Sequence, residues 1–180
     1  MTLTVADKRF YADQIRMAID NLNVRYGIYV PMPVIQWTLR GQGRMGVAFG
    51  FKSIKLHPEY AVAMGREAYL QVAIHEACHT VTTWRRHYIA KLPRQKDGRW
   101  SSHGLEWKSA MENLGRTPER CGSTTAEVRA QVKPGRVVKK VHAECACYAG
   151  HEITLNVANK VARGAGYRCR RCHTNITVKL

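Results

Sequence analysis

The stretch His75-Glu76-Ala77-Cys78-His79 decides the fold, because it is an HExxH pattern within a run, residues 69–84, that we expect to be helical. Positions i and i+4 share one face of a helix, so His75 and His79 can direct both imidazoles at one metal ion. Glu76 lies about 100° further round the helix, within reach of a water at that ion. HExxH also arises by chance, so the rest of the chain must decide between a zinc site and a coincidence.

A catalytic zinc ion takes three protein ligands and leaves a fourth position open. Residues 80–83, after His79, lack the glycine and the third histidine of the HExxHxxGxxH pattern. The candidates for the third ligand are therefore His103 and Glu106. We favour His103, since it stands between a polar loop, residues 93–102, and a helical stretch, where its side chain can turn toward the first helix.

HExxH followed at a distance by HGxxWKxxM, which begins at His103, resembles the SprT-like family of zinc metallopeptidases, which includes Spartan. Residues 54–60 resemble the family's strand and turn before the active-site helix, with His57 where asparagine is expected. The resemblance extends to a C-terminal zinc ribbon and is firmest over residues 46–111. It implies an α+β, zincin-like core with a small antiparallel sheet, in which a free strand edge within residues 47–55 binds an extended substrate.

Hydrophobic periodicity predicts a first helix over residues 4–26, capped by Thr4 and ended by Gly27. The stretches that follow are an alternating strand at 34–39, a glycine-rich connector at 41–46, one or two short strands at 47–56, and a helix from His103 to about residue 114. The expected domains are a metallopeptidase domain at 1–118, a basic linker at 119–140 with a short helix at 126–132, and a zinc ribbon at 141–180.

The predicted ribbon carries Cys145 and Cys147 as CxC, and Cys169 and Cys172 as CxxC. Four ligands leave no open position, so we expect a structural zinc ion here, with His151 as an alternative to Cys145 or Cys147. The intervening sequence predicts a strand at 152–157, a basic turn at 159–164 and a last strand at 176–178. A module of about 40 residues has too small a core to fold easily without a bound metal ion.

Cysteine spacing and hydropathy indicate in which cellular compartment the protein is expected. Short paired spacings suit metal thiolates better than disulfides. No apolar run approaches the roughly 20 residues of a membrane span, and the first residues lack the apolar core of a secretory signal. We therefore expect a cytoplasmic, nucleoid or nuclear protein that is not secreted and has no membrane partner.

The net charge of the chain is +16. From Arg129 onward there are eleven Lys or Arg residues and two acids, a net of +9, so positive charge is denser in the C-terminal part. This favours binding of DNA, single-stranded or mixed, through phosphate contacts in the C-terminal region. The ribbon's cations are Lys160, Arg163, Arg168, Arg170 and Arg171, with Tyr148 and Tyr167 interleaved. These tyrosines either stack on bases or pack the ribbon core, and the sequence leaves both open.

Two functions fit the sequence. The first is a zinc endopeptidase in which Glu76 takes a proton from water and delivers it to the leaving amine, with one catalytic and one structural zinc ion. The resemblance implies protein substrates on or crosslinked to DNA, and hence DNA–protein crosslink repair. The second is a nucleic-acid-binding or regulatory protein with a structural or inactive zincin core. The intact Glu76 argues against the second, because a purely structural zinc ion does not need that carboxylate.

Overall fold

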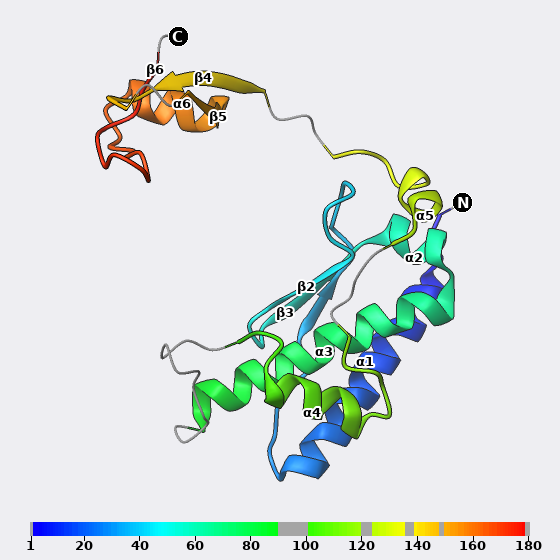
Figure 1. Ribbon diagram of the computed structural model, residues 1–180. Coiled ribbons are helices and arrows are strands. Elements are labelled where there is room, and N and C mark those ends of the chain that lie inside the picture. The colour runs from blue at the N-terminus through cyan, green and yellow to red at the C-terminus, as the bar shows by residue number, and fades with distance from the viewer. Residues whose placement is uncertain (1, 90–100, 120–123, 136–138, 148–149, 179–180) are drawn as a thin grey trace. The chain divides into compact units, whose positions relative to one another are not determined.

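The computed structural model describes residues 2–89, 101–119, 124–135, 139–147 and 150–178 of the 180-residue chain. Most of the predicted loop 93–102, and both Cys121 and Tyr148, lie outside these residues. The chain divides into two units, Met1–Gly135 and Arg136–Leu180. Within the described segments there are six helices and two three-stranded sheets, so the protein mixes helices and strands (Figure 1).

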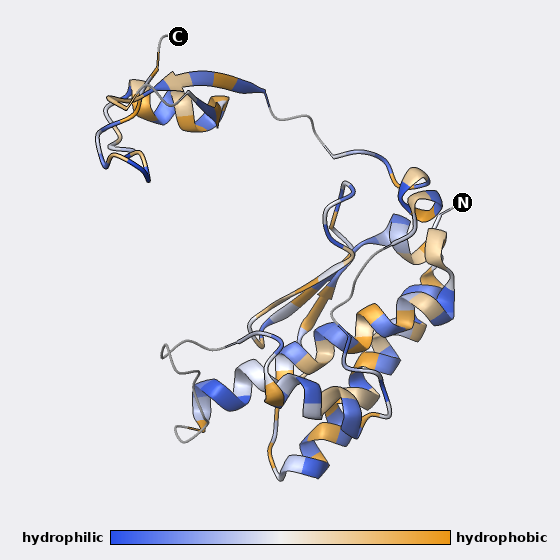
Figure 2. Cartoon of the chain, in the orientation of Figure 1, coloured by the Kyte–Doolittle hydropathy of each residue, from blue (hydrophilic) through white to orange (hydrophobic). Residues whose placement is uncertain are grey.

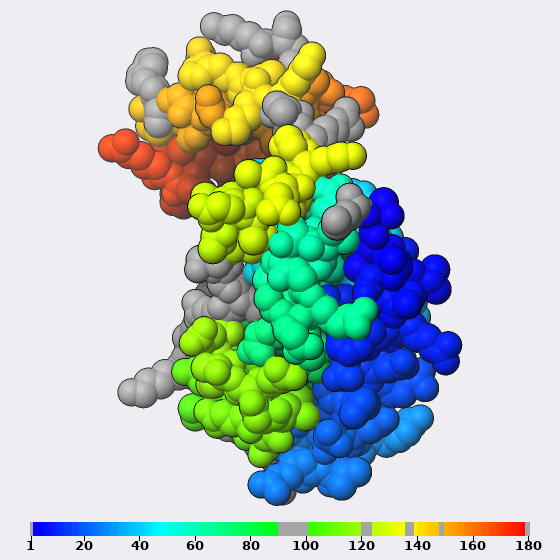
Figure 3. Space-filling model, turned by 90° about the vertical axis from the view of Figure 1, so that its right-hand side faces the viewer, coloured from blue at the N-terminus to red at the C-terminus, as the bar shows by residue number. Residues whose placement is uncertain are grey.

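The first helix, α1 (Val5–Tyr26), begins and ends where the sequence predicts. The Thr4 hydroxyl accepts a hydrogen bond from the Asp7 N–H, and the Asp7 carboxylate accepts one from the Thr4 N–H, which together form a capping box. Gly27 ends the helix in the left-handed region, with φ of 61°. The buried face consists of Tyr11, Ile15, Ala18, Ile19 and Leu22. This face packs α1 along α3 (Arg66–Tyr88), and α1 lines one side of the first unit (Figure 3).

The sheet of the first unit has the order β1-β3-β2, formed by β1 (Val34–Gln36), β2 (Gly46–Phe49) and β3 (Ser53–Leu56). The strands β2 and β3 form an antiparallel hairpin, but β1 runs parallel to β3. The prediction of an antiparallel sheet is therefore wrong for β1. Residues 37–45 and β2 stand between the two parallel strands and give the chain room to return in the same direction. The strand β2 pairs with β3 along one edge, and its other edge faces α3.

The long helix α3 forms the centre of the first unit, since it contacts α1, β2, β3, α2 (Pro58–Met64) and α4 (Leu105–Asn113). Its middle is buried almost all round, while polar residues gather toward its C-terminal end (Figure 2). The helix α2 was not predicted, although Pro58 at its first position is a start signal, and the His57 ring caps it by accepting a hydrogen bond from the Tyr60 N–H. The short helix α5 (Ala126–Ala130) lies against α2, so residues 124–135 of the predicted linker fall within the first unit.

The second unit has an antiparallel sheet of order β5-β4-β6, formed by β4 (Lys140–Glu144), β5 (His151–Thr154) and β6 (Thr177–Val178). The predicted strand 152–157 ends early, because α6 (Leu155–Ala162) follows β5 directly. The Thr154 hydroxyl accepts a hydrogen bond from the Val157 N–H and starts the helix. The helix contacts all three strands, and its Ala158 is buried. The predicted basic turn at 159–164 is therefore largely the end of a helix.

None of the helices in the described segments combines the length and the apolar character needed to cross a bilayer.

Candidate metal centres

Three histidines of the first unit meet at their Nε2 atoms. His75 and His79 lie one turn apart on α3, and His103 lies just before α4. The Nε2–Nε2 distances are 3.1 Å between His75 and His79, 3.1 Å between His79 and His103, and 3.0 Å between His103 and His75. The structure thus brings together all three histidines that the sequence predicts as catalytic zinc ligands.

Hydrogen bonding among the three rings cannot satisfy this arrangement. Each Nε2 atom carries either a proton or a lone pair, so three of them cannot make three good mutual hydrogen bonds. A single cation between them satisfies all three lone pairs at once. Ligand atoms of a tetrahedral zinc ion at ~2.0–2.1 Å lie about 3.3 Å apart, close to the spacing found here. The three residues therefore fit a zinc ion, and this group can hold a metal.

Burial keeps the two histidine rings of α3 neutral, as metal binding requires. Burial lowers the pKa of His75 to about 4, with a smaller effect of His103 in the same direction. Burial likewise lowers the pKa of His79 to about 3, assisted by the two other histidines and Arg86. The backbone of Glu119 slightly opposes the shift of His75, although His75 Nδ1 has no hydrogen bond of good geometry within the described residues. At neutral pH both rings of α3 offer lone pairs to a cation.

Trp107 forms the floor beneath the three rings. Its ring centroid lies 4.6 Å from that of His75, 4.7 Å from that of His103 and 5.6 Å from that of His79, on which it stacks. The indole is fully buried, and its Nε1–H donates a hydrogen bond of 3.4 Å to the His75 carbonyl. The tryptophan of the HGxxW stretch therefore holds α4, and with it His103, against α3.

Glu106, the alternative third ligand, turns away from the histidines. Its Oε2 accepts a hydrogen bond of 2.8 Å from Arg86 Nε, in an ion pair that is 12–14% exposed. Arg86 Nη2 also donates to the Ser101 carbonyl at 2.7 Å, two residues before His103. Arg86 thus fixes both the start of α4 and the backbone that leads to His103. This role was not predicted, because an arginine near the end of a helix is ordinarily exposed to solvent.

Glu76 lies buried between α3 and β2. Its Oε2 accepts a hydrogen bond of 2.7 Å from the Ala48 N–H of β2. Burial raises the pKa of Glu76 to about 7, and the Ala48 N–H and Arg44 oppose this rise. The approach of β2 depends on Gly46, because a Cβ atom there would lie 2.8 Å from Glu76 Cγ and 3.0 Å from its Oε1. The Glu76 carboxylate is therefore fixed to the edge of β2 through its Oε2 atom.

His75, His79, His103 and Glu76 all line one cleft of about 590 Å³. One wall of the cleft is β2 together with the connector before it, and the opposite wall is α3. Thr124 and Arg129, from the segment after α4, also line it. A cleft of this size, open along a strand edge and containing three histidines and a carboxylate of raised pKa, has the ordinary character of a catalytic or binding site.

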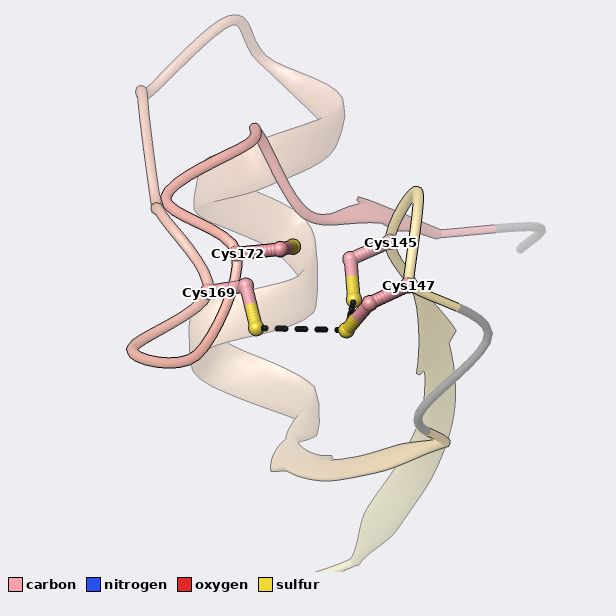
Figure 4. A group of neighbouring side chains, drawn as sticks. All are labelled: Cys145, Cys147, Cys169 and Cys172. Atoms are coloured by element: carbon pink, nitrogen blue, oxygen red, sulfur yellow. Dashed lines mark hydrogen bonds between the residues drawn. The ribbon is translucent and has the colours of Figure 1, made fainter.

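Four cysteines of the second unit meet in the same way. Cys145 and Cys147 come from the turn after β4, and Cys169 and Cys172 from the loop before β6 (Figure 4). The Sγ–Sγ distances are 3.1 Å between Cys145 and Cys147 and 3.9 Å between Cys147 and Cys169. All four form a group that can hold a metal ion, consistent with a zinc ribbon.

The backbone around the second pair of cysteines directs donors at sulfur. The Arg171 N–H lies 3.3 Å from Cys169 Sγ, and the Thr174 hydroxyl lies 3.0 Å from Cys172 Sγ. The contact with Thr174 contributes most to lowering the pKa of Cys172 to about 5. Contact with Cys147 raises the pKa of Cys145 to about 12. Four neighbouring thiolates would repel one another, and a bound divalent cation offsets this repulsion.

His151 lies beside this group. Its Nε2 is 3.1 Å from Cys145 Sγ, at the start of β5. The four cysteines make a complete set of ligands without it. His151 therefore stands as a hydrogen-bonding neighbour of Cys145, and the sequence alternative in which it replaces a cysteine is not needed to complete the group.

The chain is similar to several proteins named Protein SprT. It is 27% identical to the one of Escherichia coli (strain K12) over 180 residues, which cover 98% of this chain and 97% of the relative. It is 28% identical to the one of Proteus mirabilis (strain HI4320) over 170 residues, which cover 91% of this chain and 86% of the relative. No family model and no solved structure matches the chain.

Proposed function

Similarity to SprT proteins over nearly its whole length makes the chain a SprT-family protein, and we propose that it is a zinc-dependent endopeptidase with a zincin-like core. One observation carries the proposal: three histidines converge on one point in a cleft that also holds Glu76. A purely structural metal site would be closed by a fourth ligand, whereas this group has three among the residues that the structure describes and faces an open cleft.

His75, His79 and His103 would hold the zinc ion. When bound, zinc supplies a Lewis acid that polarises a peptide carbonyl and lowers the pKa of water to ~7. Trp107 supports the three imidazoles from below, and Arg86 fixes the chain before His103. These two residues position the ligands and do not touch the substrate.

Glu76 would act as the general base. Its Oε2 is occupied by the Ala48 N–H, so Oε1 is the oxygen that takes a proton from the attacking water and later gives it to the leaving amine. Burial raises the pKa of Glu76 to about 7, and a base of this strength can both accept and release a proton near neutral pH. The hydrogen bond from β2 also fixes the direction in which the carboxylate faces.

The free edge of β2 would bind the substrate. The Ala48 N–H points away from β3 and is bonded to Glu76, so the outward edge of this strand faces the cleft, and its other outward backbone groups are the ones offered to a substrate. An extended peptide can add to such an edge by main-chain hydrogen bonds and cross the cleft beside the histidines. Residues 47–55, predicted as the substrate edge, contain the part of β2 that does this.

The four cysteines would hold a second, structural zinc ion. The second unit carries nine Lys or Arg residues and two acids, so it is the more densely charged part of the chain. We propose that it binds DNA, single-stranded or mixed, through phosphate contacts, and thereby brings the peptidase to proteins on or crosslinked to DNA. The family resemblance and the positive charge support this step.

A second candidate function is non-proteolytic binding of nucleic acid, with the first unit as a scaffold. The observation that favours it is the excess positive charge. The placement of Glu76 argues against it, because burying a carboxylate beside three metal-binding histidines is costly and a scaffold does not require it.

A cleavage assay separates the two functions. The zinc-loaded chain is incubated with a DNA-binding protein substrate, with and without single-stranded DNA, beside Glu76→Gln. We expect cleavage by the wild type and a loss on the order of 10²–10⁴-fold in Glu76→Gln, with zinc content unchanged. Equal cleavage by both proteins would exclude Glu76 as the base, and no cleavage by either would favour the scaffold.

A further inference from the structure

The charges that line the cleft are unevenly placed. Glu76 is the one acid among the described residues that line it, whereas two arginines, Arg44 and Arg129, lie in its wall. Arg44 belongs to the connector before β2 and Arg129 to α5, which lies against α2 before the start of α3, whereas Thr83 lies toward the end of α3 and Ser102 just before α4. One end of the cleft is therefore cationic and the other is polar but uncharged.

The segment that carries Arg129 is firmly attached to the first unit. Gln42 Nε2 donates to the carbonyls of Arg129 and Val132, each at 3.0 Å, and the Val132 side chain is buried in the core. The Lys133 N–H donates to Glu59 Oε2 of α2 at 2.8 Å. These contacts hold the turn after α5 against the connector before β2, and they thereby fix the position of Arg129 in the wall of the cleft.

The connector that carries Arg44 is held from the other side. The Tyr60 hydroxyl donates to the Gln42 carbonyl at 3.0 Å, and the Tyr69 hydroxyl donates to the Met45 carbonyl at 2.7 Å. Arg44 lies close enough to Glu76 to oppose the rise in the pKa of that carboxyl. Within the described residues neither Arg44 nor Arg129 forms an ion pair, so both guanidinium groups are free to meet an anion of the substrate.

The direction of β2 places these arginines relative to the scissile bond. Arg44 stands two residues before the start of β2 at Gly46, and Glu76 contacts the strand at Ala48. A peptide that pairs antiparallel with β2, the more stable pairing, runs in the opposite direction. Its residues after the scissile bond then lie toward the start of β2 and the two arginines.

We propose that Arg44 and Arg129 select substrates that carry an acidic side chain within the first few residues on the C-terminal side of the scissile bond. This inference rests on the proposed endopeptidase function. A guanidinium group recognises a carboxylate through charge and paired N–H donors. The two arginines thus determine specificity, whereas zinc and Glu76 carry out the cleavage.

The test compares peptides that differ only in charge. Quenched fluorescent peptides carry Glu, Gln or Lys at each position after the scissile bond, and kcat/KM is measured for each. Exposed ion pairs contribute up to ~1 kcal/mol, so we expect a preference of about fivefold for Glu over Gln at one of these positions. The preference should vanish in Arg44→Ala plus Arg129→Ala, and Arg129→Glu should shift it toward Lys. Arg16→Glu, on the exposed face of α1, is the matched control and should keep it.

A binding measurement keeps this inference separate from the proposed function. The same peptides are titrated into Glu76→Gln, and the dissociation constants are read by fluorescence anisotropy. Cleavage with equal kcat/KM for Glu and Gln at every position would overturn the inference and leave the endopeptidase intact. Absence of cleavage with tighter binding of the Glu peptide would overturn the endopeptidase but support the cationic subsite. Equal binding of all peptides, or a preference that survives the double substitution, would reject the subsite.

Discussion

His103 shows how far single residues could be assigned from the sequence. HExxH placed two histidines by helix geometry alone, since the i and i+4 positions share a face. The third ligand depended on a contact across the fold, for which His103 and Glu106 stood equally near in sequence. The structure separates them through Arg86, which binds Glu106 from 20 residues away. No local pattern contains that pairing, so spacing alone left the choice open.

We predict that His103→Ala weakens zinc binding by the first unit more than about 100-fold, because it removes one of only three ligands. Zinc content of the purified chain should fall from two ions to one. Glu106→Ala should keep both ions but lower the free energy of unfolding by about 2–3 kcal/mol, since it removes the carboxylate that pairs with Arg86 Nε in a site that is only partly exposed. Elemental analysis and denaturant unfolding measure the two effects. Loss of zinc in Glu106→Ala alone would assign the third ligand to Glu106.

At the scale of elements, long amphipathic segments were predicted well and short ones were not. The helix α1 follows the predicted range closely, because its period and both caps are local signals. The helix α6 was missed, since Ile153, Thr154 and Val157 favour a strand, whereas contact with the three strands favours a helix. The parallel pairing of β1 was also missed, because strand direction depends on where residues 37–45 carry the chain.

The closeness of β2 and α3 gives a prediction at this scale. Gly46→Ala would place a methyl group 2.8 Å from Glu76 Cγ and 3.1 Å from Val72 Cγ1, so the carboxylate must move away from Ala48. We expect kcat/KM to fall on the order of 10²-fold, because small misplacements of catalytic groups have effects of that size, and stability to fall by about 1–3 kcal/mol. The zinc content should not change.

Gly43→Ala is the stability control for this variant. A Cβ atom at Gly43 meets nothing within 4 Å, and its backbone lies outside the left-handed region. Its melting temperature should stay near that of the wild type. A Gly46→Ala protein that cleaves at the wild-type rate would show that Glu76 does not need its contact with β2.

At the scale of the whole molecule, the two units differ in what stabilises them. The core of the first unit contains twenty-two buried apolar residues, including Trp107, whereas the buried apolar residues of the second unit are Ala143, Cys145, Ala158 and Cys169, as far as the structure describes it. Two of those four are cysteines of the metal group. Such a small core cannot offset the conformational entropy of about 40 ordered residues by itself.

Metal removal should therefore act on the two units differently. We predict that a strong chelator under reducing conditions unfolds Arg136–Leu180 and leaves Met1–Gly135 folded but less stable. Amide NMR spectra of the full chain should then lose the dispersed signals of the second unit and keep those of α1 and α3, and added zinc should restore them. Retention of all dispersed signals after verified loss of zinc would mean that the second unit folds without metal.

Charge density gives the last prediction, on DNA binding by the second unit. Affinity for a single-stranded oligonucleotide should fall with salt, with a log–log slope of about −0.7 for each phosphate that is neutralised. Deleting residues 136–180 should flatten the slope by about 2.8 if four contacts are lost.

Arg170→Ala plus Arg171→Ala is the finer test, because both side chains are exposed and the backbone N–H that contacts Cys169 Sγ is retained. It should flatten the slope by about 1.4 while zinc stays bound. Identical slopes for all three proteins would mean that the second unit's positive charge is solvated surface, and that any contact with DNA is made by the first unit.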